Sequence, residues 1–412
     1  MGTQEPGFGN HPTQMEQLPL LRFIPFRRSD IVRMCLYDGR LDAQGRARFE
    51  AARKRIELQF QAEFNRLRSQ LKDAYGPLDP DADTRVVEAF RDSGSDRVLA
   101  SLLEGVLNRA NYERLGPEQV KRALSHASLF QVQLHVDTND FDEVLLYTRG
   151  PSVKDEEIRK LFGLWRKNIR FVNFDRVVIY IRFKADVDVE TTLGGCQPGS
   201  TMLKLFQNVP AADLEMLFPN TRVGMRLLDK LLIGVPAVVS GGAVLTTKLG
   251  TTLVLLGSLI GFWLGLNTEP VNLDRTAVLA LVAGTGALGG YLWKQYSNYR
   301  NRKLRYTQAL TENLYFKLLD NNAGVLYRIL DEAEDSEVKE SLLAYHFLQL
   351  AGEPLSAAEL DECIECWFAE HWLCRLDFEI EDALKKLLRL ELVTENNGRY
   401  GIDPGHKDTA CS

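Results

Sequence analysis

Two neighbouring stretches in the second half of the chain are almost entirely apolar and uncharged. Residues 249–266 read LGTTLVLLGSLIGFWLGL, and residues 276–293 read TAVLALVAGTGALGGYLW. As helices rising about 1.5 Å per residue, both would cross most of a hydrocarbon core about 30 Å thick. Since only the short polar link NTEPVNLDR follows the first stretch, the pattern predicts an antiparallel transmembrane hairpin with helices at 249–267 and 276–293.

Flanking charges give this predicted hairpin an orientation. The link offers one cation, Arg275, against Glu269 and Asp274, whereas the outer flanks are basic. Their cations are Arg222, Arg226, Lys230, Lys294, Arg300, Arg302, Lys303 and Arg305. The excess of Lys and Arg on cytoplasmic loops therefore places both ends of the hairpin in the cytoplasm or its equivalent.

A further apolar stretch, at 231–248, precedes the hairpin. Gly234, Pro236, Gly241 and Gly242 interrupt it, and it ends at Lys248. A third span here would move the N-terminal part to the other side of the membrane without an export signal. We interpret the stretch as an interfacial or re-entrant segment, or as an early start of the first helix.

The pattern before residue 231 predicts helices followed by strands. Residues 1–20 are expected to be disordered, and apolar residues at helical spacing then predict a helical region at 21–125. An α+β domain is expected at 126–225, because β-branched and aromatic residues alternate there or form short runs. The predicted strands are 130–136, 144–147, 177–183 and 202–206.

Helical spacing resumes after the hairpin and predicts a helical region at 294–352, in which the acidic run at 331–337 is interpreted as a solvated helix face. Residues 353–403 then read as helix, helix, strand, turn and strand, an order that resembles the end of a winged-helix domain. A tail at 404–412 is expected to be disordered. The predicted fold class is a membrane protein of α+β type. It would combine a helical and small-sheet N-terminal cytoplasmic domain, a transmembrane hairpin and a helical C-terminal domain with a winged-helix-like end.

The net charge and the cysteines of the chain restrict the partners and the compartment that we expect. The net charge of the 412 residues is −6, and the helix that would read bases begins with Asp377, Glu379, Glu381 and Asp382. A nucleic-acid partner is therefore not expected, and the C-terminal domain is interpreted as a protein-contact module. The six cysteines are irregularly spaced, which favours a reducing compartment.

Glycines recur inside both predicted spans. The segment at 284–289 matches G-x-G-x-x-G, but no strand precedes it, as a dinucleotide-binding turn would require. Small residues four apart instead allow close helix contacts, within one hairpin or between protomers of a homo-oligomer. The predicted packing positions are Gly257, Gly261, Gly265, Gly286 and Gly290.

One cluster of potential metal ligands stands out. Cys363, Cys366, His371 and Cys374 form C-x2-C-x4-H-x2-C. On an unbroken helix Cys363 and Cys374 would be about 16 Å apart along the axis, too far for one tetrahedral ion. Unless the helix breaks near Ala369, no metal is expected. We find no Walker loop, nucleophile elbow or H-E-x-x-H, and so expect no catalytic residues and no cofactor.

Two stretches resemble a known family. Residues 204–237 (KLFQNVPAADLEMLFPNTRVGMRLLDKLLIGVPA) and 299–348 (YRNRKLRYTQALTENLYFKLLDNNAGVLYRILDEAEDSEVKESLLAYHFL) are similar to the transmembrane protein 143 family. The resemblance implies a two-span protein without an established activity. Eukaryotic members are associated with mitochondria. This chain shows no transit peptide at its N-terminus, so a bacterial inner membrane is expected and a mitochondrial membrane is the alternative.

These observations support two functional hypotheses. The first is a membrane-anchored, non-enzymatic adaptor or regulatory protein that displays cytoplasmic domains and binds a protein partner through its C-terminal domain. The alternative is a subunit of an oligomeric channel or transporter formed by the glycine-rich hairpins. In both, the lipid bilayer is a partner.

Overall fold

The structure of this protein is a computed structural model. It describes residues 19–84, 95–116, 133–136, 138–160, 165–186, 198–224 and 274–402, with isolated positions between 254 and 264. The chain divides into two compact units. Unit 1 contains Met1–Leu124, Thr138–Leu214 and Lys317–Ser412, and unit 2 contains Ser125–Asp137 and Glu215–Phe316.

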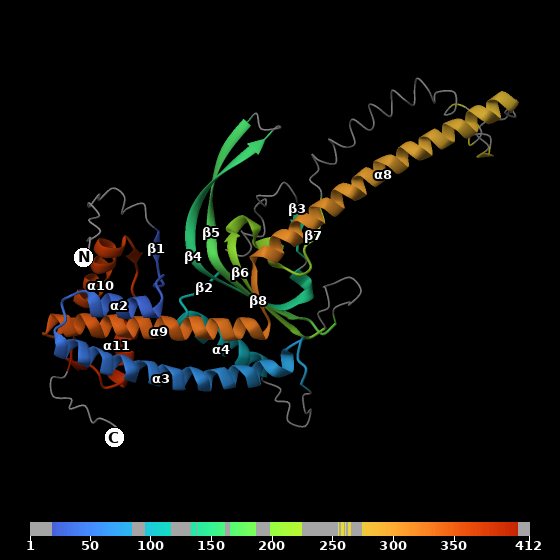
Figure 1. Cartoon of the computed structure of the whole chain (residues 1–412). Helices are drawn as coiled ribbons and strands as arrows, with labels where there is room; N and C mark the ends of the chain where they lie inside the picture. The colour runs from blue at the N-terminus through green and yellow to red at the C-terminus, as the bar shows by residue number, and fades with distance from the viewer. Residues whose placement is uncertain are drawn as a thin grey trace. The chain divides into compact units, whose positions relative to one another are not determined.

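Helices from both ends of the chain build unit 1. They are α2 (Arg28–Tyr37), α3 (Ala43–Tyr75), α4 (Ser95–Arg109), α9 (Ala323–Ala351), α10 (Ala357–Trp372) and α11 (Ile380–Arg389), with a short helix η1 (Gly76–Leu78). Helix α9 contacts all five other α-helices, and Figure 1 shows it running alongside α2 and α3. Every residue from Ser336 to Leu348 is buried, so α9 is the centre of the core.

Local signals explain where these helices begin and which face they bury. Asp42 caps α3 by accepting a hydrogen bond from the Gly45 amide (2.6 Å), as N-cap carboxylates do. The buried face of α3 follows a helical spacing through Phe49, Ile56, Phe60 and Phe64. Helix α10 begins with a capping box between Ser356 and Glu359. The sequence pattern alone therefore predicted these helices.

An antiparallel sheet completes unit 1. Its strands are β2 (Glu113–Arg114), β4 (Phe141–Lys160), β5 (Trp165–Phe183), β6 (Thr201–Pro210) and β8 (Leu318–Asn321), in the order β2-β4-β5-β6-β8. Side chains two apart on β4, β5 and β6 face the helical core. They are Leu145, Tyr147, Val178, Tyr180, Leu203 and Leu205. The predicted strands at 144–147, 177–183 and 202–206 are confirmed and are longer than expected.

Short strands join the two ends of the chain. Strand β1 (Leu20–Leu21) pairs in parallel with β10 (Arg375–Leu376). Strands β9 (Leu355–Ser356), β11 (Thr394–Asn396) and β12 (Arg399–Gly401) form a second small sheet in the order β11-β12-β9. The turn between β11 and β12 places Asn397 and Gly398 at positive φ, as tight hairpins require. Helices α10 and α11 and this hairpin match the predicted helix, helix and hairpin.

Unit 2 contains a strand pair and a long helix. Strand β3 (Gln133–His135) pairs with β7 (Arg222–Gly224), and α8 spans Arg275–Lys317. The short helices η3 (Thr138–Asp140) and η4 (Ala211–Leu217) lie near the unit boundaries in the sequence. The predicted segment at 231–248 and the predicted tail at 404–412 lie outside the described residues, as do residues 1–18 of the start predicted to be disordered at 1–20. Leu20, the last residue of that predicted start, instead begins β1.

The predicted transmembrane hairpin is wrong. None of the helices among the described residues is both long and apolar enough to cross a membrane. Only isolated positions of 249–267 are described, and α8 continues from the apolar residues 276–293 as one helix through a Lys- and Arg-rich segment to Lys317. The predicted membrane-protein fold class and the predicted location in a bacterial or mitochondrial membrane both depended on this hairpin, so both are wrong as well. The described residues form a mixed helix-and-sheet fold.

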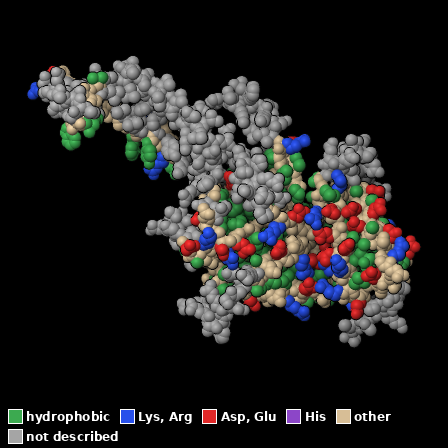
Figure 2. All heavy atoms as spheres, turned by 180° about the vertical axis from the view of Figure 1, so that it is seen from behind, with side chains coloured by type: hydrophobic (Ala, Val, Ile, Leu, Met, Phe, Trp, Pro, Cys, Tyr) green, Lys and Arg blue, Asp and Glu red, His purple; other side chains and the backbone are tan. Residues whose placement is uncertain are grey.

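The acidic run of α9 is a hub of ion pairs, and its interpretation as a solvated face is wrong. Five cations from other elements reach it. Four of the pairs are Arg68–Asp331 (3.3 Å), Arg149–Glu332 (3.0 Å), Arg28–Glu334 (3.6 Å) and Arg109–Glu337 (2.6 Å), and Lys386 also contacts Glu337. Figure 2 shows Lys and Arg interspersed with Asp and Glu over the visible face of the molecule.

The most buried part of this network surrounds Lys386 of α11. Its ammonium contacts Glu337, lies 2.6 Å from Asp382 and lies 3.6 Å from Glu340. Burial raises the pKa of Glu340 to about 7, although Lys386 and the Asn111 hydrogen bond oppose that shift. A buried carboxylate without its cation is costly, so the network ties α11 to α9.

Replacing Lys386 by Met should therefore destabilise the protein strongly. The Lys386 side chain is 9% exposed and Glu337 is 1% exposed, so the variant leaves buried carboxylates without their main cation. We expect Lys386→Met to lower the free energy of unfolding by about 3–5 kcal/mol, measured by urea denaturation at pH 7.

The adjacent Lys385 provides a matched control. Its side chain is 73% exposed and lies 3.9 Å from Glu381. Lys385→Met should change the free energy of unfolding by less than about 1 kcal/mol. Equal effects of the two variants would show that the buried network does not hold α11 in place.

Candidate functional site: an aromatic groove between α2 and α10

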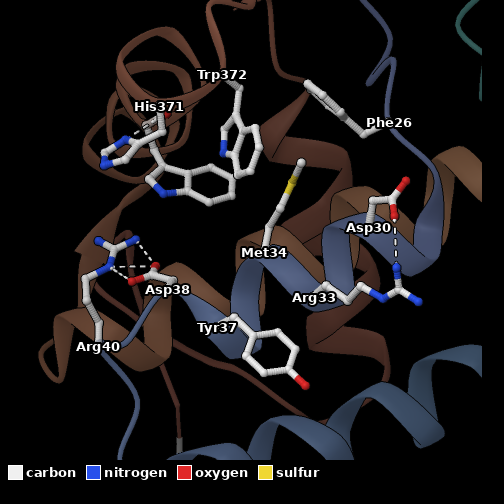
Figure 3. Close-up of a pocket in the computed structure, with 10 residues that line it drawn as sticks. Phe26, Asp30, Arg33, Met34, Tyr37, Asp38, Arg40, His371 and Trp372 are labelled. Atoms are coloured by element: carbon white, nitrogen blue, oxygen red, sulfur yellow. Dashed lines mark hydrogen bonds and ion pairs between the residues drawn. The ribbon is translucent and has the colours of Figure 1, made fainter. Parts of the chain in front are cut away.

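A cavity of about 730 Å³ lies between α2 and the C-terminal end of α10. We call it the α2–α10 groove. Figure 3 shows side chains from both helices and from the segment before α2 facing one another across it. The lining residues are Phe26, Asp30, Arg33, Met34, Tyr37, Asp38, Arg40, Trp367, His371 and Trp372. All of them belong to unit 1.

Aromatic side chains form the α10 wall of the groove. The Trp367 ring lies 6.2 Å from the Trp372 ring, edge to face, and 4.9 Å from Phe368. The ring centroid of Phe347 in α9 lies 5.5 Å from that of Trp367, again edge to face. Rings in such edge-to-face contacts hold one another in place. Trp367 is buried, whereas Trp372 is 41% exposed and available to a ligand.

Phe26 reaches the groove from an N-terminal strap, which we define as residues 20–27. Phe26 stacks on Phe368 at 5.8 Å and meets Trp372 at 5.9 Å. The buried Lys339 of α9 fixes this strap by donating to the carbonyls of Ile24 (3.0 Å) and Phe26 (3.2 Å). The position of Phe26 in the groove wall thus depends on the buried ammonium of Lys339.

Helix α2 supplies the opposite wall. Met34 points toward Trp372 in Figure 3, and a thioether can adapt its shape to a partner. Tyr37 is 81% exposed at the end of α2. Arg33 is also exposed and lies 3.7 Å from Asp30. This wall is therefore an apolar surface with a charged rim.

A polar group closes the α2 end of the groove. Arg40 Nε donates to both carboxylate oxygens of Asp38 at 2.6 Å, and the buried His346 Nε2 lies 3.5 Å from Asp38 Oδ2. Burial would raise the pKa of Asp38, but Arg40 and His346 together lower it below its usual value. Burial lowers the pKa of His346 to about 4 despite Asp38. The histidine is therefore neutral at pH 7.

This arrangement suits binding more than chemistry. Asp38 is occupied by Arg40, and the Nδ1 of His371 lies 3.2 Å from the carbonyl of Trp367, its own helix neighbour. Among the described residues that line the groove, there is no Ser, Thr or Cys that a base could activate. Open aromatic walls with a few charged groups on the rim are typical of a site for an apolar ligand group.

The four predicted metal-ligand candidates do not come together. Helix α10 runs without a break through Ala369 to Trp372, so the condition for a metal site is not met. Cys363 and Cys366 are exposed and Cys374 is buried, while His371 lines the groove. Among the described residues, no three His, Cys, Asp or Glu side chains are placed to hold a metal ion.

The predicted packing glycines meet no second helix among the described residues. A Cβ added to Gly257, Gly286 or Gly290 would find no atom within 4 Å. Gly261 and Gly265 lie outside the described residues. Packing between protomers at these positions stays a prediction.

The sequence reasoning missed the aromatic residues of the groove. It singled out His371 but not Trp367 and Trp372, which lie four residues before and one residue after it. The segment WFAEHW at the end of a predicted helix carries three large aromatic residues, more than one buried stripe requires. No sequence pattern near Phe26 and Met34 predicted that these residues belong to the groove, because they reach it only through the packing of α2 on α9.

Part of the chain matches a protein-family model. A family model described as "Protein of unknown function (DUF3754)" matches residues 174–324. That region runs from β5 to the start of α9 and includes neither wall of the groove. No solved structure matches this chain. The resemblance to the transmembrane protein 143 family stays a prediction.

His346 should make stability depend on pH. It is a base whose pKa falls from about 6.5 when unfolded to about 4 when folded. Between these values the unfolded chain binds more protons, so stability is lost as the pH falls. Between pH 7 and pH 4, we expect the free energy of unfolding of the wild type to fall by up to about 3 kcal/mol more than that of His346→Leu. Urea unfolding measures both.

The variant His346→Gln separates titration from packing. Both substitutions remove the titrating ring, so both should remove the same slope, whereas their pH-independent costs should differ. A slope that persists in both variants would exclude His346 as its source.

Proposed function

We propose that this protein is a non-enzymatic adaptor that binds a segment of a partner protein in the α2–α10 groove. The observation that supports this proposal is an apolar cavity of about 730 Å³ with two large aromatic side chains, Tyr37 and Trp372, exposed at its edge. This volume lies within the range of about 300–1,000 Å³ that is typical of ligand pockets. It would accept a few side chains of the partner.

The residue types of the groove favour a protein ligand. Trp, Tyr, Met and Arg are enriched at protein interfaces, where Trp, Tyr and Arg dominate the binding energy. Here Trp372, Tyr37, Met34 and Arg33 occupy the walls and rim. Aromatic contacts and the Lys339 hydrogen bonds hold Phe26 and the α10 wall before any ligand arrives. Such preorganisation lowers the entropic cost of binding.

The adaptor hypothesis is kept without its membrane anchor. The predicted spans supplied that anchor, and none of the described helices could serve as one. The channel or transporter alternative depended on the same spans and is not carried further. The groove instead supports the expectation that a protein binds through the C-terminal region, because α10 forms one wall.

A peptide selection on the full-length protein tests this proposal. We expect selected peptides to share a large apolar or aromatic residue that enters the groove. Trp372→Ala and Tyr37→Ala should each weaken peptide binding at least about tenfold. The reason is that truncation of an interface anchor should cost more than about 1.4 kcal/mol of binding free energy, which corresponds to a tenfold change in affinity. Fluorescence anisotropy with labelled peptides measures the affinity.

Tyr327→Ala is the matched control, because Tyr327 is a 37% exposed tyrosine of α9 that does not line the groove. It should leave the affinity unchanged. Peptides that lack an apolar consensus, or that bind Trp372→Ala as tightly as wild type, would contradict the proposed function.

A further inference from the structure

We infer that the outer face of α3 binds an acidic amphipathic helix of a partner protein. This face is a second surface of unit 1, because none of the described residues that line the α2–α10 groove belongs to α3. Figure 1 shows α3 along one border of unit 1, beside α9. Helix α3 packs on α9 and α4, and the side that faces away from them is exposed.

The exposed side chains of α3 carry a strong excess of positive charge. Among the described residues of α3, Asp73 is the one exposed carboxylate, whereas six Lys and Arg residues are exposed. These cations are Arg46, Arg48, Lys54, Arg55, Arg66 and Lys72. Such a concentration of one sign of charge attracts an anionic partner.

The glutamates of α3 do not neutralise these cations. Glu50 and Glu57 both pair with the partly buried Arg53, at 2.6 Å and 3.2 Å. Glu63 pairs with Arg109 of α4 at 2.9 Å. The glutamates alternate with the cations in the sequence, but in the structure all three are engaged in other ion pairs.

Most of the exposed cations lack an anionic partner of their own. Arg55 lies 3.7 Å from Glu391, and Lys72 lies 5.9 Å from the ring centroid of Tyr327. The other four form no ion pair within the part of the chain that the structure describes. They are Arg46, Arg48, Lys54 and Arg66. These cations extend over about 30 Å of helix, so their partner must be long as well as acidic.

A narrow apolar strip runs between the cations. Four exposed apolar residues at spacings of four, seven and four share one line on the surface of α3. They are Ala47, Ala51, Leu58 and Ala62. Leu58 is the large side chain of the strip and is 67% exposed. At about 100° per residue, Lys54 lies on one side of the strip, and Arg48 and Arg66 lie on the other.

An apolar strip with charges on both flanks favours a helix as the partner. Paired helices contact each other through a central apolar line, and the charges on either side of it select the partner. A nucleic acid would use the cations and leave the strip without a role. A bilayer surface would require more large apolar side chains than Leu58 alone. An acidic helix accounts for both the cations and the strip.

Three synthetic peptides of equal length test the inference on the full-length protein. The first places Leu and Ala on one helical face and Glu on both flanks of that face. The second carries Gln in place of Glu, and the third contains the residues of the first in an order without helical spacing. We expect the first peptide to bind at least about tenfold more tightly than either of the others, measured by fluorescence anisotropy. Its affinity should fall between about 50 mM and 500 mM salt, because salt screens exposed charges.

Variants of α3 locate the binding site. Lys54→Glu and Arg66→Glu should each weaken binding of the first peptide several-fold, because each reverses a charge beside the strip. Leu58→Ser should also weaken it by removing the large apolar contact. Lys154→Glu is the matched control, because it reverses an exposed lysine of β4, outside α3, and changes the net charge equally. All four side chains are exposed, and circular dichroism confirms that the variants fold.

Two kinds of result would overturn the inference. The first is equal affinity of the three peptides, or binding of the first peptide that is unchanged in all the α3 variants. The second is tighter binding of double-stranded DNA or of phosphatidylserine vesicles than of the first peptide, with loss in the same variants. That result would assign the cations of α3 to a nucleic acid or to a membrane surface.

Discussion

The burial of helix α9 is the constraint on which the rest of unit 1 depends. A helix with every residue from Ser336 to Leu348 buried must satisfy its charged side chains inside the protein, because an unpaired buried charge is costly. The cations that do so come from distant parts of the chain, among them Arg109 of α4 and Lys386 of α11, both of which pair with Glu337. Both ends of the chain are therefore needed to bury α9.

The α2–α10 groove is a consequence of that arrangement. Helices α2 and α10 are more than 300 residues apart in sequence, and both pack on α9. Lys339 of α9 holds the strap that carries Phe26, while Phe347 of the same helix supports Trp367. One buried helix thus orients both walls, so changes in the core are transmitted to the shape of the groove.

Sequence patterns predicted the elements of unit 1 better than their partners. Helical spacing located α3, α10 and α11, and β-branched runs located the middles of β4, β5 and β6, because these signals are local. The pairing of β1 with β10 and the ion pairs of α9 had no local signal. Hydropathy also misled: the apolar residues at 276–293 predicted a membrane span, but they belong to a helix that continues into a basic segment.

The same contrast explains why the candidate site was only partly predicted. The residues from Cys363 to Cys374 indicated a candidate site at the end of α10. They did so through their metal-ligand spacing, and not through Trp367 and Trp372. The acidic residues of α10 were visible in the sequence, yet only the structure distinguishes them from the acids of α9. The carboxylates of α9 meet cations across the core, whereas Asp361 and Glu370 meet none among the described residues. Two acidic helices of one fold therefore differ: the carboxylates of α9 pair with cations from other elements, whereas those of α10 from Asp361 to Glu370 form no ion pair within the part of the chain that the structure describes.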